Sequence, residues 1–210
     1  MIIKPFPTGP FATNAYIVAC PATSKALIID PGFDSSDLLQ AFLKEKGLTP
    51  EKILLTHSHW DHFGDAKALK EKLNIPLFVH PLDADNVRRP GTDGLPLFTP
   101  MEGFEPDGTF TEGDRIECGT LKFEVIETPG HTPGGVSFYE PQQKVLLSGD
   151  TLFQGTIGNL SFPGCSAEKM WQSLKKLAKL PGETQVFPGH GPQTTIADEP
   201  WLDQAETLFS

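Results

Sequence analysis

Short apolar runs, separated by turns rich in glycine and proline, recur along the chain and predict strands. Residues 14–20 and 25–30 are two such runs, joined by a turn that contains Pro21, and they are expected to pair. Further strands are predicted at residues 52–55, 77–79, 115–118, 121–127, 135–139, 144–147 and 186–187. Many of the connections resemble hairpins, which is typical of sheets with antiparallel neighbours.

Apolar residues at helical spacing lie between these strands. After the break at residues 30–32, Ser35 or Ser36 can cap a helix that runs to about Lys46. The other predicted helices cover residues 63–73, 81–88, 167–180 and 200–208. Because strands and helices occur in both halves, we predict a single domain over residues 1–210 of the α/β (α+β) class. Two mixed sheets packed face to face, with helices outside, would satisfy the pattern.

Two glycine-rich segments show no periodicity and are expected to be loops. Residues 89–108 contain four prolines and four glycines, and residues 149–165 are also rich in glycine. Loops of this length are often functional. Their aromatic residues are candidate apolar walls of a pocket, although ordinary packing would explain each of them equally well. The candidates are Phe98, Phe104, Phe153 and Phe162.

The charge balance argues against nucleic-acid and membrane partners. The chain has 27 acidic and 17 basic residues, a formal net charge of −10, and no basic stripe. The same charge disfavours anionic membranes, and no run approaches the roughly 18 apolar residues of a membrane span. A small-molecule substrate is therefore the expected partner, and the sequence leaves the oligomeric state open.

The cysteines and the first residues favour a cytoplasmic protein. Cys20, Cys118 and Cys165 are odd in number and widely spaced, which fits neither a disulfide framework nor a cysteine-rich zinc site. The segment MIIKPFPTGPF lacks the apolar core and cleavage site of a signal peptide. We therefore expect reduced thiols in the cytoplasm.

Three of the six histidines lie in one segment, His57-x-His59-x-Asp61-His62. In an extended backbone His57 and His59 point to the same side, because side chains alternate along a strand. Asp61 and His62 are adjacent and diverge, so one metal ion cannot readily collect all four. Asp61 could instead cap the helix predicted from Phe63, but a cap leaves the three histidines unexplained. The segment therefore predicts metal ligands, of the residue types that zinc prefers.

Three further donors each follow a glycine near the end of an apolar strand. They are His131, Asp150 and His190. A glycine allows the sharp turn that brings the next side chain to a site shared by the strand ends. Each alone is also explained as an ordinary turn residue, whereas the whole set indicates one site at the strand ends.

The number of donors predicts two metal ions. Seven donors exceed the three that a typical catalytic zinc site takes from its protein. The expected ligands are His57, His59 and His131 on one ion, Asp61, His62 and His190 on the other, and Asp150 between them. Two divalent ions are therefore the expected cofactors, with zinc favoured and iron or manganese also accepted by such donors.

A site of this kind predicts metal-dependent hydrolysis through a metal-bridging hydroxide. Asp61 and Asp150 are the residues to which we assign catalytic roles besides metal binding. The expected bond is an ester, thioester, amide or phosphoester. No Ser–His–Asp or Cys–His arrangement competes, since nearly every histidine is already assigned. The exception, His80, is expected to be a surface or packing histidine, with a role behind the ligands as the alternative.

The segments THSHWDH, PGHTPGG, SGDTLF and FPGHG resemble the metallo-β-lactamase superfamily, and the resemblance extends over nearly the whole chain. SGDTLFQGTIG and PGHGPQTT are similar to the short, single-domain hydroxyacylglutathione hydrolases (glyoxalase II-like). The resemblance implies an αββα four-layer sandwich and the same seven ligands. It also implies cleavage of a thioester such as S-lactoylglutathione or a related small ester, and Asp30 as a buried support that binds no metal.

The chain departs from these relatives in two places. Where they commonly carry Gly-Arg-x-Asp, residues 158–161 read Gly-Asn-Leu-Ser, so Asn159 replaces a cation and is a candidate pocket residue. Arg88 and Arg89, which border the long loop, are the candidates to supply that charge instead. About twenty residues follow His190, so we expect no C-terminal substrate-binding helical domain.

Two alternative functions are consistent with the same residues. A persulfide dioxygenase-like enzyme would use one iron from a subset of the ligands, but its usual Gly-Arg-Thr-Asp segment is missing. A non-catalytic metal-binding module of the same fold would not require all seven ligand positions to be filled, as they are here.

Overall fold

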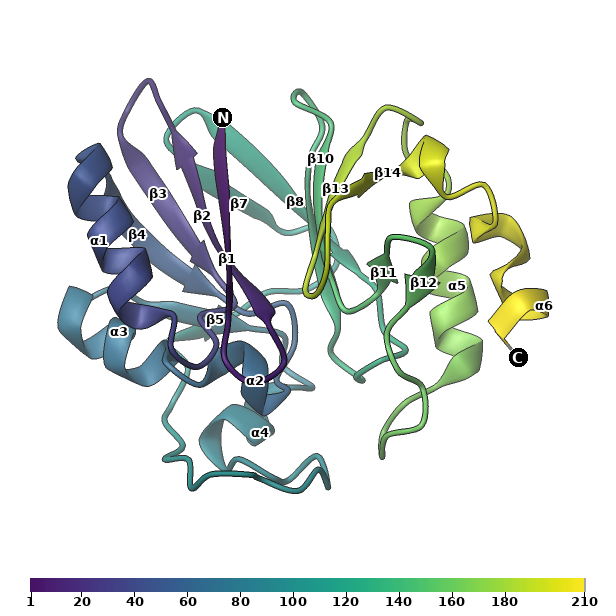
Figure 1. The fold of residues 1–210 in the computed structure, drawn as a ribbon, viewed down its shortest axis with the longest axis horizontal. Coiled ribbons are helices and arrows are strands. Elements are labelled where there is room, and N and C mark those ends of the chain that lie inside the picture. The colour runs from purple at the N-terminus through teal and green to yellow at the C-terminus, as the bar shows by residue number, and fades with distance from the viewer. Residues whose placement is uncertain (210) are drawn as a thin grey trace.

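The computed structural model describes residues 1–209, and in it two six-stranded sheets pack face to face between outer helices (Figure 1). The first sheet contains, in spatial order, β1 (Ile2–Thr8), β2 (Thr13–Cys20), β3 (Lys25–Ile29), β4 (Thr49–Leu54), β5 (Leu77–Val79) and β6 (Gly108–Thr109). The second contains β14 (Thr194–Thr195), β13 (Gln185–Pro188), β10 (Val145–Gly149), β9 (Val136–Glu140), β8 (Leu121–Glu127) and β7 (Arg115–Cys118). Both sheets are mixed, since β3 to β6 run parallel and β10 runs parallel to β13.

The helices cover the outer faces of the two sheets. Figure 1 shows α1 and α3 beside the first sheet, and α5 and α6 beside the second. The helices are α1 (Ser36–Lys46), α2 (Trp60–Phe63), α3 (Ala66–Leu73), α4 (Ala84–Arg88), α5 (Ala167–Leu177) and α6 (Ala205–Phe209). A small hairpin, β11 (Leu152–Phe153) and β12 (Thr156–Ile157), projects from the end of β10.

The burial of β2 explains the four layers. All eight of its residues are buried. Ala15, Ile17 and Ala19 pack into the cluster beneath the first helices, while Tyr16 and Val18 pack between the sheets. A strand with two apolar faces needs a layer on each side. A third cluster joins the second sheet to α5, which completes the αββα four-layer sandwich and confirms the predicted fold.

Strand β1 is not predicted by the sequence pattern, because Pro5 and Pro7 interrupt it. Proline cannot donate a backbone hydrogen bond and is usually excluded from central strands. In the structure β1 is the edge strand of its sheet and pairs with β2, so its prolines are tolerated.

The predicted helix over residues 63–73 is wrong in its boundaries, because the structure has two helices here, α2 and α3. Asp61 lies inside α2 and caps neither helix. Its Oδ2 accepts a hydrogen bond from Thr13 Oγ1 at 2.7 Å. The capping alternative for Asp61 is therefore excluded.

Other boundaries also shift. The predicted helix over residues 81–88 begins at Ala84, and the one over residues 167–180 ends at Leu177. The one predicted over residues 200–208 is a 3-10 turn followed by α6. No helix in the described part of the chain has the length and apolar character needed to cross a membrane.

Candidate metal centre

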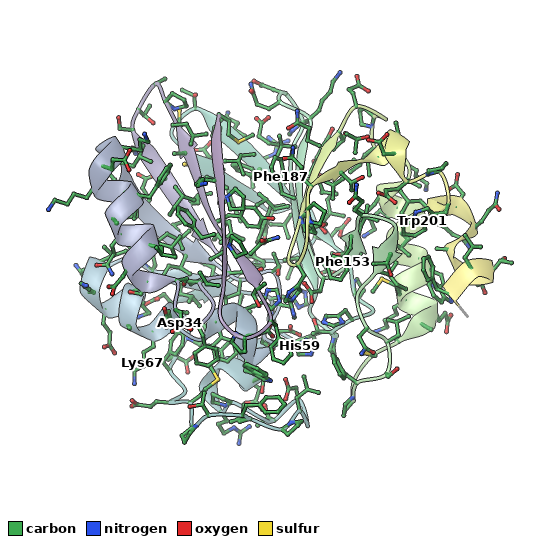
Figure 2. The ribbon with its side chains drawn as sticks, in the orientation of Figure 1. Asp34, His59, Lys67, Phe153, Phe187 and Trp201 are labelled. Atoms are coloured by element: carbon green, nitrogen blue, oxygen red, sulfur yellow. The ribbon has the colours of Figure 1, made fainter. Side chains whose placement is uncertain are left out.

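Four connections that leave strands at one edge of the sandwich carry the predicted ligands. They follow β4, β8, β10 and β13, and deliver His57, His131, Asp150 and His190 respectively. The connection after β4 continues through His59 into α2. Figure 2 shows His59 at the junction of the two sheets, with Phe153 across from it.

The structure brings six of the seven predicted donors together in two neighbouring groups. Within each group the donor atoms lie within 4.8 Å of one another. The first group is His57, His59 and His131, and the second is Asp61, His62 and His190. These are the two sets expected from the sequence.

Asp150 lies between the two groups. Its Oδ2 is 3.4 Å from Nε2 of His131 in the first group and 3.5 Å from Nε2 of His190 in the second. Its Oδ1 is 3.5 Å from Nε2 of His62. A single carboxylate therefore reaches both groups, as a bridging ligand must.

Three buried donor atoms of this cluster have no hydrogen-bond partner: His57 Nε2, His131 Nε2 and Asp150 Oδ1. Buried polar atoms in folded proteins are nearly always paired, and each exception requires an explanation. All three point into the shared cluster of imidazole and carboxylate donors, which are the ligand types of zinc and iron sites. The residues present therefore fit bound metal ions.

A third grouping, of Asp30 with His57 and His62, also has its donor atoms close together. Asp30 is already occupied, because its oxygens accept hydrogen bonds from Thr56 N at 2.7 Å and Thr56 Oγ1 at 2.6 Å. Its Oδ2 also lies 3.1 Å from His62 Nδ1. Asp30 thus orients a ligand from behind, in agreement with the supporting role that the resemblance implied.

Backbone carbonyls orient two other ligands in the same way. His131 Nδ1 donates to the Asn159 carbonyl at 2.8 Å, and His190 Nδ1 donates to the Phe11 carbonyl at 3.1 Å. A hydrogen bond at Nδ1 fixes the tautomer and leaves Nε2 free to bind a metal. Asn159 therefore has two roles: it lines the pocket, and its backbone carbonyl orients the ligand His131.

Residues at the start of β2 hold the loop that carries His190. The hydrophobic periodicity of the sequence did not predict this role. Asn14 Nδ2 donates to the carbonyls of Pro188 at 3.0 Å and Gly191 at 2.9 Å. The Tyr16 hydroxyl donates to the same Pro188 carbonyl at 2.6 Å. These bonds join the first sheet to the second directly beside the second group of donors.

Glycine is required before the later ligands for two different reasons. Gly130 and Gly149 have φ of 148° and 52°, which favour glycine as the sequence argument expects. At Gly189 the reason is space, because a Cβ there would lie 2.0 Å from Asp150 Oδ1. Any side chain at Gly189 would therefore displace the carboxylate that reaches both groups.

The two histidines of the HxH pair are held neutral. Burial lowers the pKa of His57 well below its usual value, and the nearby His62 lowers it further. Burial likewise lowers the pKa of His59 to about 3. Neutral imidazole is the form that binds a metal ion, so this pair needs to lose no proton on binding.

The second group has the opposite electrostatics. Burial lowers the pKa of His190, but the carboxylates of Asp150 and Asp61 outweigh it and raise the pKa to about 9. Burial also opposes the charge on His62, and the same carboxylates raise its pKa well above the usual value. Burial raises the pKa of Asp61, whereas His62 and the hydrogen bond with His190 lower it to about 2 overall. Without a metal, positive charge is therefore held between these carboxylates by protonated imidazole.

Asp83, which the sequence analysis did not single out, joins the two ligand-bearing loops of the first group. Its Oδ2 accepts from the Ser58 amide at 2.9 Å, and its Oδ1 accepts from the Gly134 amide at 2.7 Å. Ser58 lies between His57 and His59, and Gly134 follows His131 by three residues. Asp83 is 3% exposed, and burial raises its pKa. In the sequence Asp83 resembles any capping aspartate, so no pattern identified it as a support of the ligand-bearing loops.

Replacing Asp83 by asparagine is expected to lower the free energy of unfolding of the metal-free protein by about 1–3 kcal/mol. An asparagine has one acceptor oxygen, and its NH₂ would face a second backbone N–H donor. Urea denaturation measures the effect. The control is Asp85→Asn, an exposed acid on the same helix that pairs with Arg89, for which we expect a change within about 0.5 kcal/mol. Equal stability losses in the two variants would contradict the role of Asp83.

One cavity of about 480 Å³ opens onto the donor cluster. Its walls include four of the five pocket residues proposed from the sequence: Phe98, Phe153, Asn159 and Phe162. Five of the predicted ligands also face it: His59, Asp61, His131, Asp150 and His190. The remaining walls, which the sequence analysis missed, are Phe11, Trp60, Leu95 and Pro96.

Phe104 does not belong to these walls. It packs against the cluster of the first sheet and borders a different hollow, beside α3. The loop over residues 89–108 reaches the cavity with its middle part only, and Phe104 lies on the return toward β6. Its candidacy as a pocket wall was therefore wrong.

The two arginines that border this loop do not reach the cavity. Arg88 pairs with Glu105 at 2.8 Å and Arg89 pairs with Asp85, and neither arginine is among the cavity's lining residues. Their expected role as replacement cations is therefore not supported. His80 is buried rather than on the surface, and its Nε2 lies 2.9 Å from Glu127 Oε1, which agrees with the packing alternative.

The Metallo-beta-lactamase superfamily model matches residues 8–190 of the chain. A protein of Bacillus subtilis named probable metallo-hydrolase YqgX is 38% identical over 92% of each chain. The hydroxyacylglutathione hydrolase GloC of Haemophilus influenzae is 33% identical over 95% of each chain. Both similarities extend well beyond the ligand motifs.

Solved structures agree with the sequence relatives. The crystal structure of the BLEG-1 B3 metallo-beta-lactamase has a TM-score of 0.90 and 37% identity, and the similarity covers 100% of both chains. The crystal structure of TTHA1623 in a di-iron-bound form has a TM-score of 0.80 and 40% identity, covering 93% of this chain and 96% of that one. With its fold, its two donor groups and these relatives, the chain belongs to the metallo-beta-lactamase superfamily.

Proposed function

We propose that the protein is a dinuclear metal-dependent hydrolase of small thioesters. The observation that carries the proposal is the position of Asp150, whose carboxylate lies between two complete three-donor groups. The seven donors identified from the sequence would hold two divalent ions. Zinc is the metal that we expect, and the di-iron form of TTHA1623 supports iron as the alternative.

The protein's own residues would bind and orient the substrate. When bound, the ions would supply a nucleophile by lowering the pKa of water and would polarise the acyl carbonyl. Thr13 holds the carboxylate of Asp61 at the cavity wall through its hydroxyl. The aromatic walls would exclude bulk water from the acyl group. Overall, water adds its oxygen to the acyl carbon, the C–S bond breaks, and the products are a carboxylic acid and a thiol.

The thioester class is supported by the name of the Haemophilus influenzae relative, a hydroxyacylglutathione hydrolase. The similarity to a B3 metallo-beta-lactamase makes β-lactams the main competing substrates. The net charge of −10 favours a small-molecule substrate over nucleic acid or an anionic membrane.

A substrate panel tests the proposal. Metal-reconstituted protein is offered thioesters, lactones, β-lactams and phosphodiesters, before and after chelation. We expect thioester hydrolysis that is lost on chelation and restored by metal. Faster cleavage of another ester class, or no cleavage at all, would contradict the proposal. Oxygen uptake with a persulfide and no hydrolysis would favour the dioxygenase alternative.

We expect S-lactoylglutathione to be hydrolysed with a KM about one to two powers of ten above that of a relative with a cationic pocket. Glutathione has two carboxylates, and no lysine or arginine is among the described residues that line the cavity. A lost charged hydrogen bond costs roughly 1.5–3 kcal/mol, which sets this range. Steady-state kinetics measures it.

Arg88→Ala and Arg89→Ala provide the controls, because both arginines are paired with acids away from the cavity. Neither substitution should change the KM for S-lactoylglutathione. A low KM that rises sharply in either variant would show that the loop supplies the cation after all.

A further inference from the structure

We infer, on the basis of the proposed function, that the cavity selects thioesters with an apolar acyl group and an uncharged thiol carrier. The inference rests on three features of the cavity: a cluster of three aromatic rings at one wall, two further rings beside the donor groups, and the lack of lysine and arginine among the described lining residues.

Phe11, Trp60 and Phe98 form the first feature. Their ring centroids are 5.3 Å apart for Phe11 and Trp60, 5.4 Å for Trp60 and Phe98, and 6.2 Å for Phe11 and Phe98. The rings come from the turn between β1 and β2, the start of α2, and the loop over residues 89–108. Three segments far apart in sequence therefore build one apolar surface at the cavity.

Two of these rings are unusually exposed for their type. Phe98 is 74% exposed and Phe11 is 51% exposed, and they are two of only five exposed large hydrophobic residues described in residues 1–209. Exposed apolar residues gathered at a cavity mark a binding surface more often than scattered ones do. Both line the cavity that contains the donor groups, so an apolar part of the substrate is the occupant that fits them.

Two further rings continue the apolar lining next to the donors. The ring of Phe162 lies 5.7 Å from that of His59 and 6.0 Å from that of His131. The ring of Phe153 lies 6.0 Å from that of His190. An acyl group extending from the donor cluster would therefore contact aromatic rings, which favours aryl and alkyl groups.

The charged residues of the cavity disfavour an anionic carrier. Among the described residues that line it, the charged side chains other than histidine are the carboxylates of Asp61 and Asp150. A glutathione carboxylate placed among the aromatic walls would lose water and gain no lysine or arginine partner in return. An uncharged carrier such as N-acetylcysteamine has no such cost.

Acyl thioesters of N-acetylcysteamine with increasing chain length, and a phenylacetyl member, test the inference against the same acyl groups on glutathione. We expect kcat/KM to rise by up to about fourfold for each added methylene until the cavity is filled, as burial of a CH₂ group predicts. For each acyl group, the N-acetylcysteamine thioester should be the better substrate by about tenfold or more.

Phe98→Ala is the informative variant, because Phe98 is exposed and its replacement leaves the core intact. It should lower kcat/KM for the longest and the phenylacetyl substrates about three- to tenfold and flatten the chain-length series. Leu38→Ala is the matched control, since Leu38 on α1 is 49% exposed and does not line the cavity. The series should be unchanged in that variant.

Binding to the metal-free protein separates this inference from the proposed function. The probes are the benzyl thioethers of N-acetylcysteamine and of glutathione, measured by calorimetry. We expect tighter binding of the neutral thioether and a loss with Phe98→Ala even if no substrate is hydrolysed, in which case only the proposed function fails. Hydrolysis with a flat series, equal binding of the two probes, or self-association that buries Phe98 and excludes the probe would overturn the inference.

Discussion

Replacing Asp150 by alanine is expected to remove both metal ions and to abolish hydrolysis. The carboxylate lies 3.4 Å and 3.5 Å from nitrogens of the two donor groups, so its loss weakens each group. Removal of a residue behind a ligand already costs about 10- to 100-fold in metal affinity or activity, and removal of a shared ligand should cost more at each ion. Elemental analysis of protein dialysed against limiting metal, with thioesterase kinetics, measures the result.

Two further variants make the experiment specific. Asp150→Asn keeps the shape of the side chain and removes its charge, so it should also lose metal while the fold persists. His190→Ala removes a ligand of one group only, and should keep one ion per chain, whereas we expect two ions in the wild type. A fully loaded, active wild type with a single ion would contradict the two-metal arrangement. Retention of both ions in Asp150→Asn would contradict the bridging role.

The donor groups were predictable from the sequence because metal binding restricts residue types more than folding does. One histidine or aspartate after a Gly at a strand end is also explained as an ordinary turn residue, but the whole set indicates one site. Two of the glycines have the positive φ that such turns require. The division of the donors into two groups followed from the alternation of His57 and His59 and the divergence of Asp61 and His62. The structure has the same two sets.

The supporting residues could not be predicted in this way, because their role depends on contacts across the two sheets. Asp83 accepts one amide from each ligand-bearing loop, and these amides are 76 positions apart, at residues 58 and 134. Phe11 is a lone aromatic residue in a turn, and only the fold places it beside Phe98. Strand β1 was missed because a proline-containing edge strand has no regular pattern. Local periodicity carries no information on such long-range neighbours.

Lowering the pH from 8 to 6 is expected to weaken metal binding at the second group about a hundredfold, and to affect the first group much less. In the metal-free protein, His62 Nε2 and His190 Nε2 are 3.2 Å apart, so only one of these facing nitrogens can hold a proton. The carboxylates of Asp61 and Asp150 raise the pKa of His190 to about 9, above this window. A metal ion must displace that proton, which costs tenfold in affinity for each unit of pH below the pKa.

Metal affinity falls as the pH falls, because the protonated form of His190 competes with the metal. This form stays populated until the pH rises past about 9. In the first group, the lowered pKa values of His57 and His59 leave both imidazoles neutral throughout the window. His59→Ala isolates the second group and His190→Ala isolates the first, so zinc affinity can be measured for each at pH 6, 7 and 8 by competition. The logarithm of affinity should change by about one per pH unit in His59→Ala and far less in His190→Ala. Equal slopes in the two variants would mean that the carboxylates do not hold a proton at the second group.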